Sequence, residues 1–539
     1  MSFTTHTISK FRLSPAAVLL LPALIYYAIL AHYHFINVPR NDDFSAILDW
    51  LIVWNDTAGF QDKASWLLQQ HYSHRILTTR IITLLSTING GVVSLVFIQI
   101  TGWACWFLFV LLLIKSSKRL SCSTLLTLAT GLLLFNPVGS SNFITAMQGP
   151  QNLGIHLLTL SSFLLATRAE RTCFALALII GSVAVFTSAN GLIVLPLIAS
   201  YYGFQGRWKA CGSAVISSVG VTMLYFYGFE KEPTPWLPGS MVNQFFVMLG
   251  SPFCLLKSSH ELAFWVGIPI ALSSAMLLLQ FKLINEKPVA WLFLAFLFGS
   301  CLMAALGRMG WPDDYMIQDR YRVYGLLILV MLISLAPAGK YLEKYAVQLG
   351  ILGLAAIFWT LGYLNNSAWL VAAASWKKST AINAQLDYAF PYISLETWPK
   401  AQKTLTDSVQ LQIYHPPRIL KETKLNFQSG SANPPVAQTW EIIRSDAGAG
   451  YWLIPRIIIT PRPDHAFIIL PDNQAIHLPS LSQRAPLKTF LSSGKLIAEK
   501  YKLTLPLSLE WNGAARLIET DINQDGSLAI RSESMLTSP

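Results

Sequence analysis

Long apolar runs separated by short polar connections dominate the sequence. A helix needs roughly 20 predominantly apolar residues to cross the hydrocarbon core of a bilayer. Several runs are close to that length, and their charged residues stand at the ends. The pattern therefore predicts a polytopic α-helical membrane protein with about eleven transmembrane helices. The runs lie at residues 15–34, 91–114, 122–136, 152–167, 172–189, 191–205, 211–228, 262–281, 289–306, 323–338 and 347–366.

A twelfth apolar run, at residues 242–256, is broken by Gly250, Ser251 and Pro252. We interpret this run as re-entrant or interfacial because a full crossing would reverse the side of every later loop. The lysines and arginines support that choice, since cytoplasmic loops are enriched in them. Eleven crossings put these basic residues on one side: Lys10, Arg12, Lys115, Lys118, Arg119, Arg168, Arg171, Arg207, Lys209, Lys282, Lys287, Lys340 and Lys344.

This arrangement predicts a cytoplasmic N-terminus and a C-terminus on the outer side. Composition agrees with a membrane protein, since 53% of the residues are hydrophobic and only 12% are charged. A soluble protein has roughly a quarter charged residues. The net charge of +11 belongs to inner loops and lipid headgroups, because no basic run with interleaved aromatics indicates a nucleic-acid module. The six cysteines include no C-x-x-C pair, so thiols give no metal or redox site.

The polar tail differs from the rest of the chain. Short strand patterns between turn residues predict a small β-containing domain on the outer side. We therefore divide the chain into a transmembrane domain at residues 1–366 and an outer domain at residues 367–539. The predicted strands lie at residues 457–460, 466–470, 495–499 and 503–509.

The first outer loop, residues 35–90, is long and amphipathic. Residues 44–54 and 64–70 are predicted to lie along the interface, where their tryptophans suit the headgroup region. Residues 76–88 are apolar but carry Arg80, which favours a juxtamembrane helix.

Two adjacent carboxylates, Asp42 and Asp43, directly follow the first span. A carboxylate near apolar walls can serve as a general base, since its pKa rises toward the useful range. The alternative is structural, because aspartate is a preferred N-cap and Phe44 could begin an interfacial helix.

Arginines on the outer side run against the usual charge bias. Their fork of donors matches phosphate oxygens, and Arg75 and Arg320 are the favoured phosphate ligands. The alternative is pairing with Asp313, Asp314 or Asp319, or with ordinary headgroups. The five outer arginines are Arg75, Arg80, Arg308, Arg320 and Arg322.

Other polar residues could complete a site. The amides of Gln148, Gln151 and Asn152 could bind sugar hydroxyls or satisfy the backbone of a packed loop. His71 and His74, three apart on a possible helix, could hold a divalent metal together with Asp42 or Asp43, or could be interfacial polar residues. Trp311 and Tyr315 are interpreted as residues of the interfacial aromatic belt.

This layout resembles the C-type (GT-C) integral-membrane glycosyltransferases. Those enzymes carry an acidic residue in the first outer loop, interfacial helices in that loop and often a soluble outer domain after the last span. Asp42 and Asp43 stand at the acidic position, and residues 367–539 match the terminal domain. The segment from His74 to Arg80, and Arg320 with Tyr321, are similar to pieces of bacterial members.

The resemblance implies transfer of a sugar from a polyprenyl-phosphate donor to a glycan or lipid-linked acceptor. The site would face the periplasm of a bacterial plasma membrane, where the acidic residue deprotonates the acceptor. Basic and polar residues, including His74 and Tyr321, would hold the donor. Members with monophosphate donors commonly work without a metal. No W-W-D-type signature occurs, which disfavours transfer to protein asparagine.

Two other classes of function remain open. A transporter or flippase of a lipid-linked substrate would place charged residues in mid-span, and the predicted spans hold almost none. A non-catalytic envelope assembly protein would use the outer domain to bind a partner.

Overall fold

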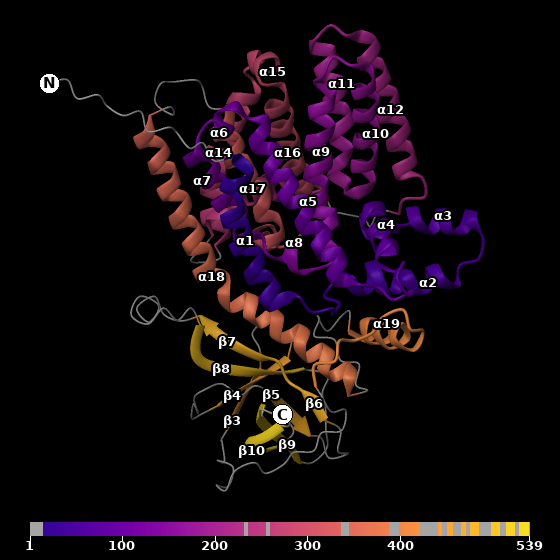
Figure 1. Cartoon of the computed structure of the whole chain (residues 1–539), viewed down its shortest axis with the longest axis vertical. Helices are drawn as coiled ribbons and strands as arrows, with labels where there is room; N and C mark the ends of the chain where they lie inside the picture. The colour runs from indigo at the N-terminus through magenta and orange to yellow at the C-terminus, as the bar shows by residue number, and fades with distance from the viewer. Residues whose placement is uncertain are drawn as a thin grey trace, which may run out of the picture.

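The protein is a helical bundle with β-sheets at one end (Figure 1). The computed structural model describes residues 14–230, 236–254, 259–335, 344–386 and 398–420, and then strands and short connections between residues 440 and 537. The strand region is described at residues 440–444, 450–455, 465–469, 475–484, 497–506, 514–522 and 528–537.

Each of the eleven predicted apolar runs contains a helix. Among the described residues, six helices are long and apolar enough to cross a membrane: α1, α5, α12, α14, α16 and α18. Others are shorter, such as α7 with 11 residues, which is about 16 Å long. The bounds are α1 Pro15–His34, α5 Leu95–Ser116, α7 Thr124–Leu134, α9 Gly154–Ala166, α10 Arg171–Thr187, α11 Val194–Phe204, α12 Trp208–Phe226, α14 His260–Leu278, α16 Pro288–Gly307, α17 Asp319–Leu335 and α18 Tyr345–Gln385.

Local sequence explains where several helices begin. Ser14 caps α1, because its hydroxyl accepts from the Ala17 amide and Pro15 occupies the first turn. Ser94 caps α5 in the same way through the Phe97 amide. Serine at these positions satisfies amides that no helical carbonyl can reach.

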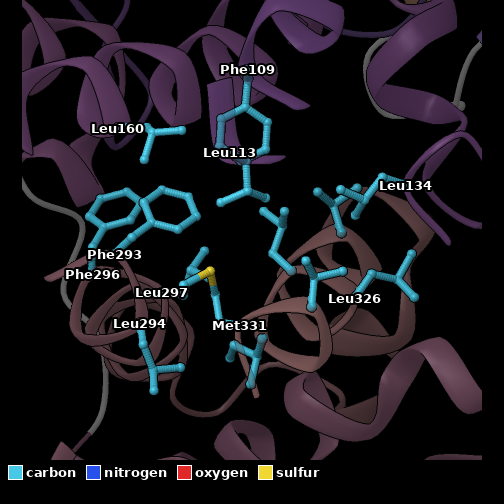
Figure 2. Packing of buried hydrophobic residues seen from close by; sticks show 14 of the residues in the cluster. Phe109, Leu113, Leu134, Leu160, Phe293, Leu294, Phe296, Leu297, Leu326 and Met331 are labelled. Atoms are coloured by element: carbon cyan, nitrogen blue, oxygen red, sulfur yellow. The ribbon is translucent and has the colours of Figure 1, made fainter. Parts of the chain in front are cut away.

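The bundle interior is filled by aromatic and leucine side chains. Phe109 and Leu113 of α5 pack near Phe293 and Leu297 of α16 (Figure 2). Glycines allow the closest backbone contacts. A Cβ added at Gly102 would lie 2.7 Å from the Cα of Gly149, so α5 and the second outer loop meet backbone to backbone.

The loops separate into two groups at opposite ends of the bundle. At the end predicted to lie outside, called the outer end below, the Ser141 amide donates to Asp319 and Gln244 donates to the Trp311 carbonyl. At the other end, Arg119 donates to the Ile333 carbonyl. This grouping agrees with the predicted division of the loops into two sides.

Helix α13, Pro238–Gly250, covers most of the run predicted not to cross. Its 13 residues span about 20 Å, short of the hydrocarbon core. It begins near Gly310, whose amide donates to Ser240, and it ends against the first turns of α14 and α17. Both of its ends therefore lie near the outer end of the bundle. The short helix η5, Ser251–Phe253, follows it.

The first outer loop contains the predicted interfacial and juxtamembrane helices. One prediction is wrong here, because His71 and His74 face each other across a β-hairpin and are not on a helix. The elements of this loop are η1 Phe44–Asp49, α2 Trp50–Asp56, α3 Phe60–Leu68, β1 Gln70–His71, β2 His74–Arg75 and α4 Leu77–Ser86. The other connections hold α6 Lys118–Ser121, η2 Pro137–Gly139, α8 Ser141–Ile144, η3 Gly149–Leu153, η4 Ala189–Ile193, α15 Lys282–Glu286 and η6 Asp313–Ile317.

Helix α18 runs across the predicted domain boundary. Its 41 residues extend about 60 Å, roughly twice the hydrocarbon thickness. The predicted division between residues 366 and 367 therefore lies inside one continuous helix. The apolar first half of α18 is the predicted last span, and its more polar second half reaches the β-sheets (Figure 1).

The C-terminal strands form two four-stranded antiparallel sheets, in the orders β10-β9-β5-β6 and β3-β4-β8-β7. The predicted strand at 466–470 is β5, and those at 495–499 and 503–509 form one strand, β8. The prediction at 457–460 lies outside the described residues. The strands are β3 Trp440–Arg444, β4 Gly450–Pro455, β5 His465–Ile469, β6 Ala475–His477, β7 Ser480–Arg484, β8 Ile497–Pro506, β9 Ala514–Ile522 and β10 Leu528–Thr537.

Contacts of α18 and of helix α19, Trp398–Gln410, link the C-terminal part of the chain to the helical bundle. Asn383 of α18 exchanges two hydrogen bonds with the backbone of His477 in β6. Helix α19 lies against the first outer loop, where Lys400 pairs with Asp49 at 3.2 Å.

Candidate functional site

Asp43 is buried and holds two outer loops together. Its side chain is fully covered, and its carboxylate accepts hydrogen bonds from three backbone amides. These are the amides of Arg40 at 3.0 Å, Ala146 at 3.2 Å and Met147 at 2.8 Å. The first outer loop is thereby fixed to the second.

Burial raises the pKa of Asp43 to about 6, against the opposing effects of the amides and of the nearby Lys377 charge. No surface of Asp43 is left for a substrate hydroxyl. We therefore correct one prediction, because the geometry makes Asp43 an anchor and not an accessible base.

Asp42 has the opposite character. It is half-exposed, and its carboxylate forms no hydrogen bond with the described residues, while Ser45 and Ala46 bond only to its backbone carbonyl. The carboxylate lies within electrostatic range of Arg320. Of the two predicted bases, Asp42 is the one that a substrate can reach.

Arg308 and Arg320 share two aromatic rings at the outer end. The Arg320 guanidinium lies 4.9 Å from the Tyr315 ring and 5.1 Å from the Tyr321 ring. The Arg308 guanidinium lies 5.8 Å and 4.9 Å from the same two rings. Arg320 also donates to the Tyr315 hydroxyl. Cation–π contacts hold both charges close together, where they would attract an anion.

Two nitrogens without hydrogen-bond partners in the described chain adjoin this pair. The Nε of Arg320 and the Nδ1 of His74 are buried without a hydrogen-bond partner. Burial, chiefly, and then the charges of Arg308 and other neighbours lower the pKa of His74 to about 3. His74 is therefore a neutral imidazole at physiological pH, beside two cations.

Arg75 and Arg80 have structural partners instead. Arg75 donates to the carbonyls of Leu68, Tyr225 and Tyr227. Arg80 donates to three carbonyls at the end of α3, and its charge lies 5.4 Å from the Trp50 ring. Backbone carbonyls occupy all three nitrogens of the Arg75 guanidinium, which leaves it no free nitrogen for a phosphate. In Arg80 only Nη1 bonds to carbonyls, and its Nε is buried without a partner.

Arg322 also has a structural position. It is buried, and its Nε donates to the Ile317 carbonyl at 2.8 Å, which joins η6 to α17. The predicted alternative partners divide into two groups. Asp319 lies within electrostatic range of Arg320 and Arg322. The side chains of Asp313 and Asp314 lie outside the described part of the structure.

The predicted amides serve mainly to position the loops. Asn152 donates to Asn142 at 2.8 Å, and Asn142 donates to the Arg320 carbonyl at 3.1 Å. Gln148 and Gln151 are buried, and the Oε1 of Gln148 has no partner. The amide segment therefore supports the backbone that carries Arg320.

Sequence reasoning missed two features of this site. Tyr315 was assigned to the aromatic belt, yet it stacks under both arginines. The second is Asn142, which supports the backbone of Arg320. Aromatic residues close to arginines in one loop were the available signal.

The structure also bears on the predicted metal site at His71 and His74. Among the described residues, no group of three or more His, Cys, Asp or Glu side chains could hold a metal ion. His71 and His74 therefore lack a third partner in the described part of the chain.

The site thus combines an accessible carboxylate, Asp42, with two cations, Arg308 and Arg320, and a neutral imidazole, His74. Such a set can bind an anion and accept a proton from a hydroxyl next to it. No protein-family model, curated protein or solved structure matches this chain.

Proposed function

We propose that the protein is a membrane glycosyltransferase that moves a sugar from a polyprenyl-phosphate donor to a glycan or lipid-linked acceptor. The observation that carries the proposal is the placement of Asp42 within electrostatic range of Arg320, which shares two tyrosine rings with Arg308. A reaction of this class needs a base for the acceptor and cations for the departing phosphate.

The roles follow from exposure and charge. Asp42 takes the proton of the acceptor hydroxyl as its oxygen attacks the anomeric carbon. The bond from that carbon to the phosphate oxygen breaks, and the lipid phosphate leaves with the electron pair. Arg308 and Arg320 hold the negative charge that develops on the phosphate. His74 can donate one further hydrogen bond to it.

The proposed topology places this site at the outer face of a bacterial plasma membrane. Eleven crossings, a cytoplasmic N-terminus and a periplasmic β region belong to the proposal. It is supported by eleven helices that coincide with the apolar runs and by loops gathered at two ends. An outer-leaflet lipid phosphate would then lie level with Arg308 and Arg320.

The test compares three asparagine variants in cells that lack the native gene. Asp42→Asn should reduce modification of the envelope glycan at least about 100-fold, because the general base is lost. Asp49→Asn is the matched control, since Asp49 pairs only with Lys400 at a partly exposed position, and it should keep wild-type modification.

Asp43→Asn should instead lower the amount of folded protein in the membrane, because an anchor between two loops is weakened. Membrane abundance and thermal unfolding separate the two effects. Normal glycan modification by a folded Asp42→Asn variant would exclude Asp42 as the base.

A further inference from the structure

A second group of basic side chains lies buried near Asp43. His34 ends α1, Arg40 lies in the following connection and Lys377 lies in the second half of α18. The exposed fractions of these side chains are 1%, 9% and 3%. His34 is within electrostatic range of both Arg40 and Lys377, so the three form one cluster.

Three nitrogens of this cluster have no partner among the described residues. Both ring nitrogens of His34 and the Nη1 of Arg40 are buried without a hydrogen-bond partner. The guanidinium of Arg40 lies 4.9 Å from the Trp369 ring, which covers one of its faces. A buried donor without a partner costs roughly 1–3 kcal/mol, and more when it is charged.

The neighbouring acids do not neutralise the cluster by direct pairing. Arg40 lies within electrostatic range of Asp43 and Asp319, but no ion pair within 4.0 Å joins them in the described chain. The Asp43 carboxylate is bound by three backbone amides, and an Asp319 oxygen accepts from the Ser141 amide. Both acids are therefore partly committed elsewhere.

The charges around Asp43 also indicate that the basic cluster is not neutralised. Arg40 and Lys377 both lie within electrostatic range of Asp43, so this one carboxylate faces two buried cations. Buried cations are normally paired with an anion.

We propose that His34, Arg40 and Lys377 form a second anion site, which binds a phosphate group where α1 and α18 meet the first outer loop. Arginine and lysine present several donors to phosphate oxygens, and the Trp369 ring holds the guanidinium in place. The long side chains of Arg40 and Lys377 can separate around the anion. The phosphate can belong to a phospholipid headgroup or to a small soluble molecule.

This site does not depend on sugar transfer, so its test measures binding. The purified full chain in a nonionic detergent is titrated with inorganic phosphate at constant ionic strength, and thermal unfolding is followed. A parallel arm compares nanodiscs of phosphatidylcholine alone with nanodiscs that contain phosphatidylglycerol. Stabilisation by phosphate alone indicates a soluble ligand, and stabilisation by phosphatidylglycerol indicates a headgroup.

Arg40→Gln and Lys377→Gln should each weaken the binding at least about tenfold, because each removes a charged donor. Lys282→Gln is the matched control and should keep the binding, since Lys282 is exposed at the surface. Wild-type protein that binds neither probe overturns the proposal. Binding that Arg320→Gln abolishes and that Arg40→Gln and Lys377→Gln keep also overturns it, because such binding belongs to the proposed donor site.

A measurement on the wild-type chain tests the proposal even if the variants fail to fold. An electron cryomicroscopy map with both probes present should show density between Arg40 and Lys377. Density for water only, or direct pairing of these side chains with Asp43, would overturn the proposal. If the wild-type protein shows this density but has no transfer activity, the proposed sugar transfer is contradicted and the second anion site is not.

Discussion

At the scale of single residues, two adjacent aspartates have opposite environments. Asp42 is half-exposed beside Arg320, while Asp43 is fully buried among backbone amides. The sequence could predict a candidate base at this position, because two aspartates directly follow the first apolar run. It could not predict which of them is accessible, because that depends on Ala146 and Met147, about a hundred residues away.

The burial of Asp43 gives a pH dependence with a definite sign. Its pKa rises from 3.8 to about 6 on folding, so the folded state holds the proton more strongly. The contribution to stability is full below about pH 4 and is lost as the pH rises through 6. The free energy of unfolding should fall by up to about 3 kcal/mol across this window.

The check is a series of thermal unfolding curves from pH 4 to pH 7 for the wild type and Asp43→Asn. The difference between the two proteins should change across this window, because the variant has no carboxyl to titrate. Asp49→Asn serves again as the exposed control. A constant difference between wild type and Asp43→Asn would show that Asp43 does not titrate in this range.

At the scale of elements, one glycine contact determines where the second outer loop sits. Gly102 of α5 meets Gly149 backbone to backbone, and the same loop carries the amides that bind Asp43. Gly102→Ala should destabilise the protein by about 1–3 kcal/mol, because a Cβ would lie 2.7 Å from the Gly149 Cα.

Gly154→Ala is the matched control, since nothing lies within 4 Å of the Cβ position in the same helical bundle. That change should be neutral or slightly stabilising, because alanine favours the helix. Chemical or thermal unfolding in detergent distinguishes the two variants. Equal stability of both would mean that α5 and the loop are not in close contact.

Helices were easier to predict than their limits or partners. Apolar runs are local and strongly periodic, so all eleven predicted runs contain helices. The sequence could not show that α18 continues past residue 366, because its later polar residues contact the β-sheets, as Asn383 does with His477. The sequence could not show that Arg75 donates to backbone carbonyls, because Tyr225 and Tyr227 are distant from it in the chain.

At the scale of the whole molecule, the number of crossings determines which ends of the bundle share a compartment. Eleven crossings place the β region and the first outer loop together, opposite the loops rich in lysine and arginine. If only the six helices that are long enough to cross a membrane did so, the basic loops and the first outer loop would not have to lie on opposite sides. The hydrogen bonds between α18 and β6 link the sheets to the outer end.

Single cysteines in a cysteine-free background test this topology. In spheroplasts, a membrane-impermeant maleimide should label Asn89→Cys in the first outer loop and Met535→Cys on β10, because both positions are exposed. Lys209→Cys, at the start of α12, should react only after permeabilisation, because basic loops stay in the cytoplasm. Labelling of Lys209→Cys in intact spheroplasts would contradict the eleven-span arrangement, and with it a donor site built from outer loops.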